Sequence, residues 1–327
     1  MPRTTAGLTL VAAIALAACG ERERATISTS SSEITSPSVA ESGATIETPA
    51  TSPAPPEAPV TYADAEAVFQ HGGYAEAAGM FESYTRGNPD NAWGQYMLGL
   101  SAWKSGQHER ALQAFDAALQ IEPAHRKSLF NSARVLLETD QPEEALERVQ
   151  KALSIEPLSA EGLRLLGRSY AALGKNDEAV DAYRRALAID DSDVWAMNNL
   201  GYLYIQEGRS DAALPPLARA VEIRGNVPVF QNNLGTALER TGHLSDASKA
   251  YETALQSDST YEKASVGLAR VTARIEGTDT VAVDLAALSQ EFQGEIEQWR
   301  TAAALTDSTK VEPTVQASVM VRDTVSQ

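Results

Sequence analysis

The chain has 327 residues, of which 43% are hydrophobic but only 6% are aromatic, so a packed core is possible and small side chains must supply much of it. A formal net charge of −17 is opposite in sign to that of most nucleic-acid binders, and we expect no nucleic-acid partner. A single cysteine excludes an intrachain disulfide and a thiolate metal cage. The histidines lack metal-ligand spacing, so we predict no metal and no cofactor.

The first elements in chain order are a short apolar segment and the cysteine that follows it. Leu8 to Ala18 is preceded by the positive charge of Arg3, is too short to span a bilayer as a helix, and is typical of a signal-peptide core. Its last residues, Leu-Ala-Ala directly before Cys19, resemble the bacterial lipoprotein signal. The resemblance implies a signal peptide over 1–18 and a lipid on Cys19. Gly20, in place of the aspartate typical of inner-membrane retention, favours the outer membrane.

The alternative for this segment is an ordinary secreted protein with an incidental cysteine. Residues 19–60 follow, and they are rich in Ser, Thr and Pro. Such a composition buries too little apolar surface to order the chain, so we predict a disordered tether. Its root-mean-square span would be roughly 35 Å.

From residue 58 onward the sequence repeats with a period of 34. Three similar segments begin 34 residues apart: "ALQAFDAALQIEP" (111–123), "ALERVQKALSIEP" (145–157) and "AVDAYRRALAIDD" (179–191). Extending this period in both directions gives six units, which begin near 58, 92, 126, 160, 194 and 228. The eighth residue of every unit is Ala or Gly, the twentieth is Ala, and the twenty-fourth is Phe, Val, Tyr or Leu. This pattern predicts two antiparallel helices per unit that touch at small residues, with the bulky residue filling the gap to the next unit.

The turns of these units are also marked. Glycine recurs at position 15, where a left-handed helix cap suits it, and proline recurs at position 32, where the second helix must end. These residues are Gly106, Gly174, Gly208, Gly242, Pro89, Pro123 and Pro157. In the fifth unit Pro215-Pro216 lies inside the second helix, and we expect it to kink or delay that helix.

These columns resemble the tetratricopeptide repeat (TPR), most completely in the fourth unit, where Leu166-Gly167, Tyr170, Ala179, Tyr183 and Ala186 match its pattern. The resemblance implies an all-α helical solenoid over 61–277, with about six helix-turn-helix repeats and a capping helix at 261–277. The first unit has Asp64 where leucine is usual, so it is expected to be a cap and not a full repeat.

An additional amphipathic helix is predicted over 278–304, before a disordered tail at 305–327. Its apolar stripe consists of Leu285, Leu288, Phe292, Ile296 and Trp299. One interpretation is that this helix covers the exposed end of the solenoid. The other is a dimer contact or a partner-binding helix.

No pattern typical of an enzyme is present, and we predict no catalytic residues. There is no phosphate-binding glycine loop and no Gly-x-Ser-x-Gly sequence. The four histidines fall at turns or between units, where they are expected to be surface residues: His71, His108, His125 and His243.

The family resemblance implies a concave groove lined by the first helix of each unit. Its predicted peptide-binding residues are Trp93, Tyr96, Lys127, Asn131, Arg134, Arg164, Arg168, Trp195, Asn198, Asn199, Tyr202, Asn232 and Asn233. Amides donate to and accept from a peptide backbone, guanidinium groups suit carboxylates or phosphates, and aromatic rings anchor apolar side chains. Alternatively, the asparagines satisfy neighbouring helices and the arginines pair with acids of this chain.

Together these features predict a non-catalytic interaction scaffold tethered to the bacterial envelope by the lipid on Cys19. Its partners would be peptide segments or envelope proteins held in the groove. Resemblance to known outer-membrane repeat lipoproteins suggests assembly of a pilus or another envelope complex. The alternative is an adaptor that docks a cell-wall enzyme at the membrane through its C-terminal helix. The oligomeric state stays open.

Overall fold

A computed structural model describes residues 59–275 and 282–308, and within these ranges all regular secondary structure is helical. The predicted signal peptide, Cys19, almost all of the predicted linker and most of the predicted tail lie outside the described residues. The first helices of the six units are α1 (Tyr62–Gln70), α3 (Ala92–Lys104), α5 (Arg126–Glu138), α7 (Ala160–Ala172), α9 (Val194–Gln206) and α11 (Pro228–Arg240). The second helices are α2 (Tyr74–Gly87), α4 (His108–Ile121), α6 (Pro142–Ile155), α8 (Asn176–Ile189), α10 (Ser210–Ile223) and α12 (Leu244–Ser257).

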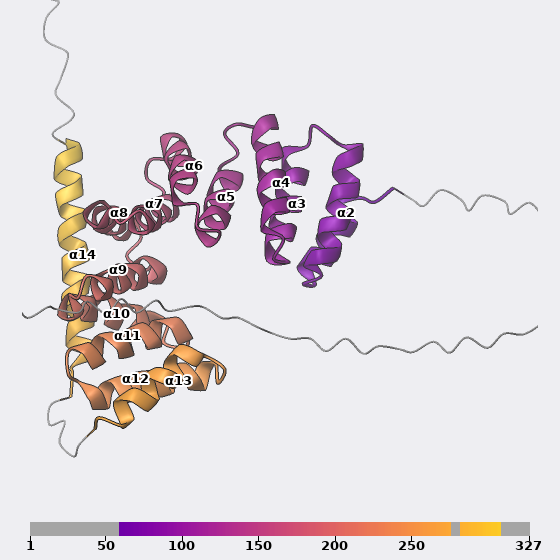
Figure 1. The fold of residues 1–327 in the computed structure, drawn as a ribbon. Coiled ribbons are helices and arrows are strands. Elements are labelled where there is room, and N and C mark those ends of the chain that lie inside the picture. The colour runs from indigo at the N-terminus through magenta and orange to yellow at the C-terminus, as the bar shows by residue number, and fades with distance from the viewer. Residues whose placement is uncertain (1–58, 276–281, 309–327) are drawn as a thin grey trace, which may run out of the picture. The chain divides into compact units, whose positions relative to one another are not determined.

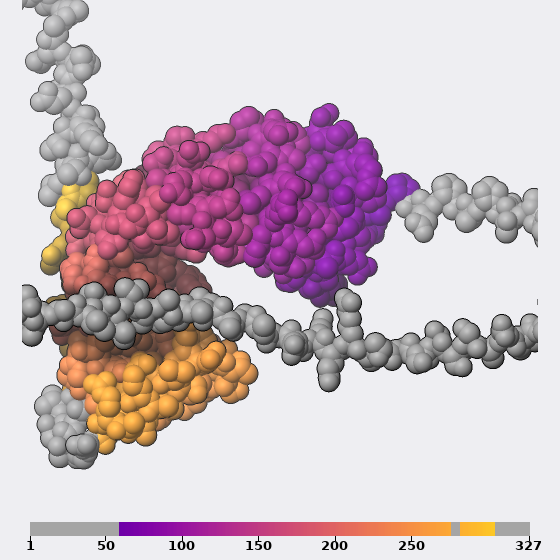
Figure 2. All heavy atoms as spheres, in the orientation of Figure 1, coloured from indigo at the N-terminus to yellow at the C-terminus, as the bar shows by residue number. Residues whose placement is uncertain are grey.

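The helices stack in chain order, and each contacts the next (Figure 1). Side chains of successive units meet in one continuous surface, coloured from indigo to orange in Figure 2. Two further helices, α13 (Glu262–Thr272) and α14 (Leu285–Ser308), follow the sixth unit. The predicted all-α repeat solenoid is therefore confirmed.

The small residue at position 8 and the bulky residue at position 24 meet inside the four units that have glycine at position 8. A Cβ atom added to Gly167 would lie 2.5 Å from the ring of Tyr183, and one on Gly201 would lie 2.5 Å from Leu217. The third unit has Ala133 at this position and the smaller Val149 opposite, both fully buried. The bulky residue thus fills its own unit first. Because Tyr251 also contacts Gly267 of α13, it can fill the gap to the next helix as well.

The turn between the two helices of a unit adopts the left-handed conformation predicted from its glycines. Gly106, Gly174, Gly208 and Gly242 have φ between 70° and 91°. The third unit has Asp140 instead, with φ 59°, and it is the one non-glycine residue with positive φ in the described ranges. Aspartate tolerates this region better than most residues, which explains why the period continues without an insertion.

Two local irregularities behave differently from one another. Helix α1 has nine residues and begins late in its unit, where Asp64 completes a capping box with Thr61. That is the role of the residue found where leucine is usual. In contrast, α10 keeps the same fourteen residues and the same start as the other second helices despite Pro215-Pro216. The expected delay of this helix is therefore wrong.

Helix α14 does not cover the end of the solenoid, and that expectation is corrected by its contacts. It packs across α8 and α10, the second helices of the fourth and fifth units (Figure 1). Phe292 and Ile296 are almost fully buried there, and Arg300 donates to the carbonyl of Ala188 at 3.1 Å. The helix continues to Ser308, four residues into the predicted tail.

The sixth unit is instead followed directly by α13, as predicted, which packs on α11 and α12. None of the helices in the described ranges combines the length and the apolar character needed to cross a membrane.

Candidate functional site

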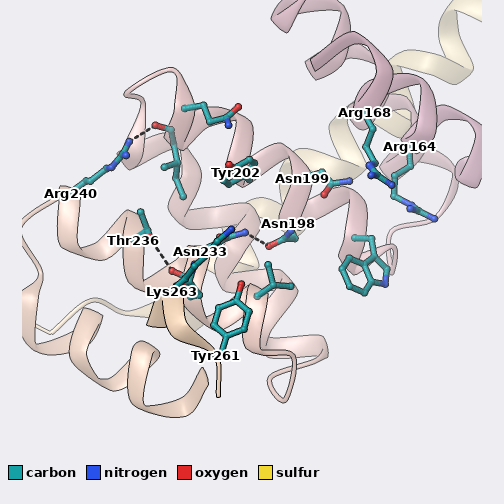
Figure 3. Close-up of a pocket in the computed structure, with 15 residues that line it drawn as sticks. Arg164, Arg168, Asn198, Asn199, Tyr202, Asn233, Thr236, Arg240, Tyr261 and Lys263 are labelled. Carbon is teal, nitrogen blue, oxygen red and sulfur yellow. Dashed lines mark hydrogen bonds between the residues drawn. The ribbon is translucent and has the colours of Figure 1, made fainter. Parts of the chain in front are cut away.

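A hollow of about 710 Å³ opens between the first helices of the C-terminal units, and we call it the groove cavity (Figure 3). Helices α7, α9, α11 and α13 supply most of its walls. Its lining includes eight of the thirteen predicted peptide-binding residues: Arg164, Arg168, Trp195, Asn198, Asn199, Tyr202, Asn232 and Asn233. Its volume lies within the usual range for ligand pockets.

Several lining residues are not in the predicted set, although Thr236 at position 9 of the sixth unit and Lys263 on the capping helix follow the repeat phase that predicted the groove. The lining residues outside the predicted set are Ile205, Gln206, Val229, Thr236, Arg240, Tyr261 and Lys263. Gln206 and Arg240 both occupy position 13 of their units, one turn after position 9. The repeat phase therefore contained the signal that locates them.

The other five predicted residues lie outside the groove cavity and contact one another, and we call them the N-terminal cluster: Trp93, Tyr96, Lys127, Asn131 and Arg134. The ammonium group of Lys127 lies 4.8 Å from the centre of the Trp93 ring, a cation–π contact. The indole nitrogen of Trp93 donates to the hydroxyl of Tyr62 at 2.6 Å. These polar and aromatic groups hold neighbouring units together.

Arg134 in this cluster is bound within the chain. It forms an ion pair with Glu161 of the next unit and donates to the side-chain oxygen of Asn131 at 2.5 Å. Its charge is thus already matched by a carboxylate of the solenoid.

Position 6 of the repeat is asparagine in three units, and the structure separates their roles. Asn131 donates to the hydroxyl of Tyr96 at 3.1 Å, and Asn233 donates to the side-chain oxygen of Asn198 at 2.9 Å. In both pairs the acceptor is position 5 of an earlier unit, 35 residues before. Asn199 makes no side-chain hydrogen bond to any other residue that the structure describes, so its amide is available in the groove cavity.

The groove cavity is cationic although the whole chain is acidic. Arg164, Arg168, Arg240 and Lys263 line it, and no lining residue is Asp or Glu. The Nε of Arg164 lies 2.8 Å from a carboxylate oxygen of Asp193, a residue that does not itself line the cavity. Arg240 donates to the carbonyl of Ile205 at 2.5 Å. In Figure 3 the first two arginines lie at one end of the cavity and Arg240 at the other.

Arg168 differs from Arg164 because no carboxylate of the described residues lies within ion-pair distance of it, and it differs from Arg240 because it donates to no carbonyl of these residues. Because the group is partly withdrawn from water, burial lowers the pKa of its guanidinium. A second hollow of about 370 Å³ also borders Arg168, Asn199 and Tyr202. The arginine therefore lines two open spaces, and its guanidinium donates to none of the other residues that the structure describes.

Two aromatic side chains give the groove cavity apolar surface. Trp195 is 42% exposed and Tyr202 is 47% exposed, which is unusual for large rings in this chain. Trp195 packs edge-on against Phe230, with ring centres 4.9 Å apart. The ring is thus fixed on one side and open on the other, which suits an anchor for an apolar group.

The histidines do not form a site. His125 is buried and accepts a hydrogen bond from the backbone of Ser128 at the start of α5, so the expectation of a surface turn residue is wrong for it. Burial lowers the pKa of its imidazole. The described residues contain no cluster of His, Cys, Asp and Glu that could hold a metal ion.

Four profiles of the tetratricopeptide repeat match the chain, at residues 62–126, 102–168, 167–208 and 194–227. Residues 62–227 therefore belong to the tetratricopeptide repeat family, as their columns predicted. No curated protein matches the chain. No enzyme family is among the matching profiles, and proteins built from these repeats typically act as non-catalytic interaction scaffolds.

Solved structures agree on the fold. A thermophilic TPR protein from Thermus thermophilus is 21% identical with a TM-score of 0.50, over 56% of this chain and 100% of that one. A tetratricopeptide repeat protein from Parabacteroides merdae is 15% identical with a TM-score of 0.56, over 64% and 82%. The APC/C hetero-tetramer Cut9–Hcn1 contains a chain that is 16% identical with a TM-score of 0.57, over 63% and 41%.

Proposed function

We propose that this protein is an interaction scaffold that holds an extended peptide segment of a partner in the groove cavity of its fourth to sixth units. The observation that carries this proposal is the combination of an amide and a guanidinium group without a side-chain hydrogen bond in the described chain, and of two exposed rings, all lining one cavity. Asn199 offers an amide, Arg168 offers a guanidinium group, and Tyr202 and Trp195 offer exposed rings. Such groups serve a peptide backbone, an acidic group and apolar side chains respectively.

The contacts of α14 favour binding in the groove cavity over recruitment of a partner by α14 itself. The apolar stripe expected to recruit a partner packs on α8 and α10 of the same chain. Its burial leaves the groove cavity as the surface with unused binding groups.

Selection of random peptides by the full chain tests the proposal. A displayed library of peptides about 12 residues long, each spanning roughly 40 Å when extended, should yield sequences enriched over the input. The double variant Asn199→Ala/Tyr202→Ala should lose most of this enrichment. The variant Lys151→Ala, changed at an exposed residue of α6, should keep it. Enrichment that is absent, or equal in the double variant, would contradict binding in the groove cavity.

We further propose that the scaffold is anchored in the bacterial envelope, at the outer membrane and facing the periplasm, by a lipid on Cys19. Support comes from the apolar segment and the small residues before this cysteine. The partner would then be an envelope protein, as in assembly of a pilus or another envelope complex.

Replacement of Cys19 by serine should release the protein from membranes because several acyl chains, and not the solenoid, supply the attachment. Fractionation after a high-salt wash measures this release. The unchanged chain should stay with the membrane and incorporate labelled palmitate. A Cys19→Ser protein that remains in the washed membrane fraction would show that the attachment does not depend on this lipid.

A further inference from the structure

Two arginines at the same place in successive units differ in their partners. Arg134 is the ninth residue of the third unit and Arg168 the ninth residue of the fourth, 34 residues later. Arg134 pairs with Glu161, the second residue of the unit that follows it. The residue equivalent to Glu161 for Arg168 is Trp195. Where the earlier unit has a carboxylate, the later unit therefore has an indole ring.

This replacement leaves a cation beside an open cavity. Arg168 has no carboxylate of the described chain within ion-pair distance, while it lines both the groove cavity and the second hollow beside it. A partly buried guanidinium without an anion is less stable than a paired one, because desolvation removes its interaction with water. An anion delivered by a ligand would restore the pairing that Arg134 has.

The surroundings select among anions. Trp195 and Tyr202 present apolar ring surface in the cavity that Arg168 lines, and the Asn199 amide can serve a peptide group. Arg240 and Lys263 place further positive charge farther along the same cavity (Figure 3). A chain with several separated negative charges fits this arrangement better than a single small anion does.

We propose that the peptide segment bound in the groove cavity is acidic, and that one of its carboxylates pairs with Arg168 as Glu161 pairs with Arg134. This inference rests on the proposed function and adds the chemical class of the partner. Its other acidic side chains, or a C-terminal carboxylate, approach Arg240 and Lys263. Trp195 then acts as a specificity residue, since it leaves Arg168 to the ligand.

The peptides selected from the random library by the full chain supply the first test, which needs no variant. They should contain more Asp and Glu than the input library, and selection in high salt should reduce that excess because the charges are partly exposed. Enriched peptides with no excess of acidic residues would overturn the acidic class while the groove function stands. A library that yields no enriched peptide at all would overturn the groove function itself.

Affinities of one selected acidic peptide supply the second test. Arg168→Gln should lower the affinity for this peptide about 10- to 100-fold, which is the loss expected for a hydrogen bond to a charged group. Arg134→Gln, the equivalent change one unit earlier, should leave the affinity within about twofold because that arginine already has Glu161. Equal losses in both variants would contradict the assignment of Arg168.

A third test places a carboxylate of the protein itself where it can pair with Arg168 in place of the peptide. Trp195→Glu gives the fifth unit the carboxylate that the fourth unit has, so it should weaken the acidic peptide more than Trp195→Gln does. Both variants remove the ring, and their difference measures the carboxylate alone. A Trp195→Glu protein that binds as well as Trp195→Gln would overturn the proposed pairing.

Discussion

Replacement of Phe292 by alanine is expected to detach α14 from the solenoid and to lower the free energy of unfolding of this region by about 3–5 kcal/mol. Phe292 is 1% exposed, and it packs edge-on against Trp299 with ring centres 5.6 Å apart. Removing the ring leaves a cavity between α14 and the second helices beneath it. Because α14 contacts α8 and α10 and not the N-terminal units, the loss should stay local.

Hydrogen exchange resolves this effect along the chain. The amides of residues 285–304 should lose protection in Phe292→Ala, while those of α3 and α5 keep theirs. Gln293→Ala is the matched control, because Gln293 is the next residue of the same helix and its side chain is exposed. This variant should change the free energy of unfolding by less than about 0.5 kcal/mol. Unchanged protection of α14 in the phenylalanine variant would mean that other contacts hold this helix.

One unit departs from the repeat pattern at the place where α14 packs, and this departure, not the period itself, indicates the contact. At position 25 of the units the outer face has Glu82, Asp116, Gln150, Arg184 and Glu252, but the fifth unit has Ala218. Ala218 is 1% exposed. An apolar residue at a position that is polar in the other units indicates that this part of the surface is covered.

The solenoid itself was predictable because its determinants are local and repeat. Small residues at positions 8 and 20 permit close helix contact, and glycine at position 15 permits a positive φ; both depend on residue type at a fixed spacing. The structure adds what the columns do not show, namely the pairing of Gly167 with Tyr183 within a unit.

The candidate site was predictable only in part, for a physical reason. Long polar side chains choose among partners contributed by adjacent units, and the choice depends on the residue one unit away. Arg134 is bound by Glu161 and Asn131 by Tyr96, so neither is available in the groove cavity. Arg168 has the same repeat position as Arg134, and Asn199 has the same position as Asn131. Their neighbours differ, so both remain available to a ligand in the groove cavity.

Glu239 should make the largest single electrostatic contribution to the C-terminal end of the solenoid. Its side chain is 7% exposed and accepts from Arg270 through two contacts of 2.6 Å, from Arg274 at 3.0 Å and from the hydroxyl of Tyr251 at 3.0 Å. These donors join α11 to α12, to α13 and to the residues just after it. Glu239→Gln keeps the size of the side chain and removes its charge, so we expect it to cost about 2–3 kcal/mol at neutral pH.

The dependence of this cost on pH is the sharper test. Hydrogen bonds from Arg270 hold the pKa of Glu239 below its ordinary value of 4.5, against the opposing effect of burial. The folded state thus stays ionised where the unfolded state begins to bind a proton, so the stabilisation is complete above about pH 4.5 and disappears as the pH falls through the lower folded pKa. The difference in unfolding free energy between the unchanged chain and Glu239→Gln should therefore be constant near neutrality and shrink in acid.

Carboxylates common to both proteins cancel in this difference, which isolates Glu239 from the other acids that also titrate there. Glu252→Gln, at an exposed residue of α12, is the control and should differ little from the unchanged chain at any pH. Urea unfolding followed by circular dichroism between about pH 7 and pH 3 measures both differences. A Glu239→Gln difference that persists undiminished at the acid end would show that packing or geometry, and not the ionised carboxylate, fastens α13 to the solenoid.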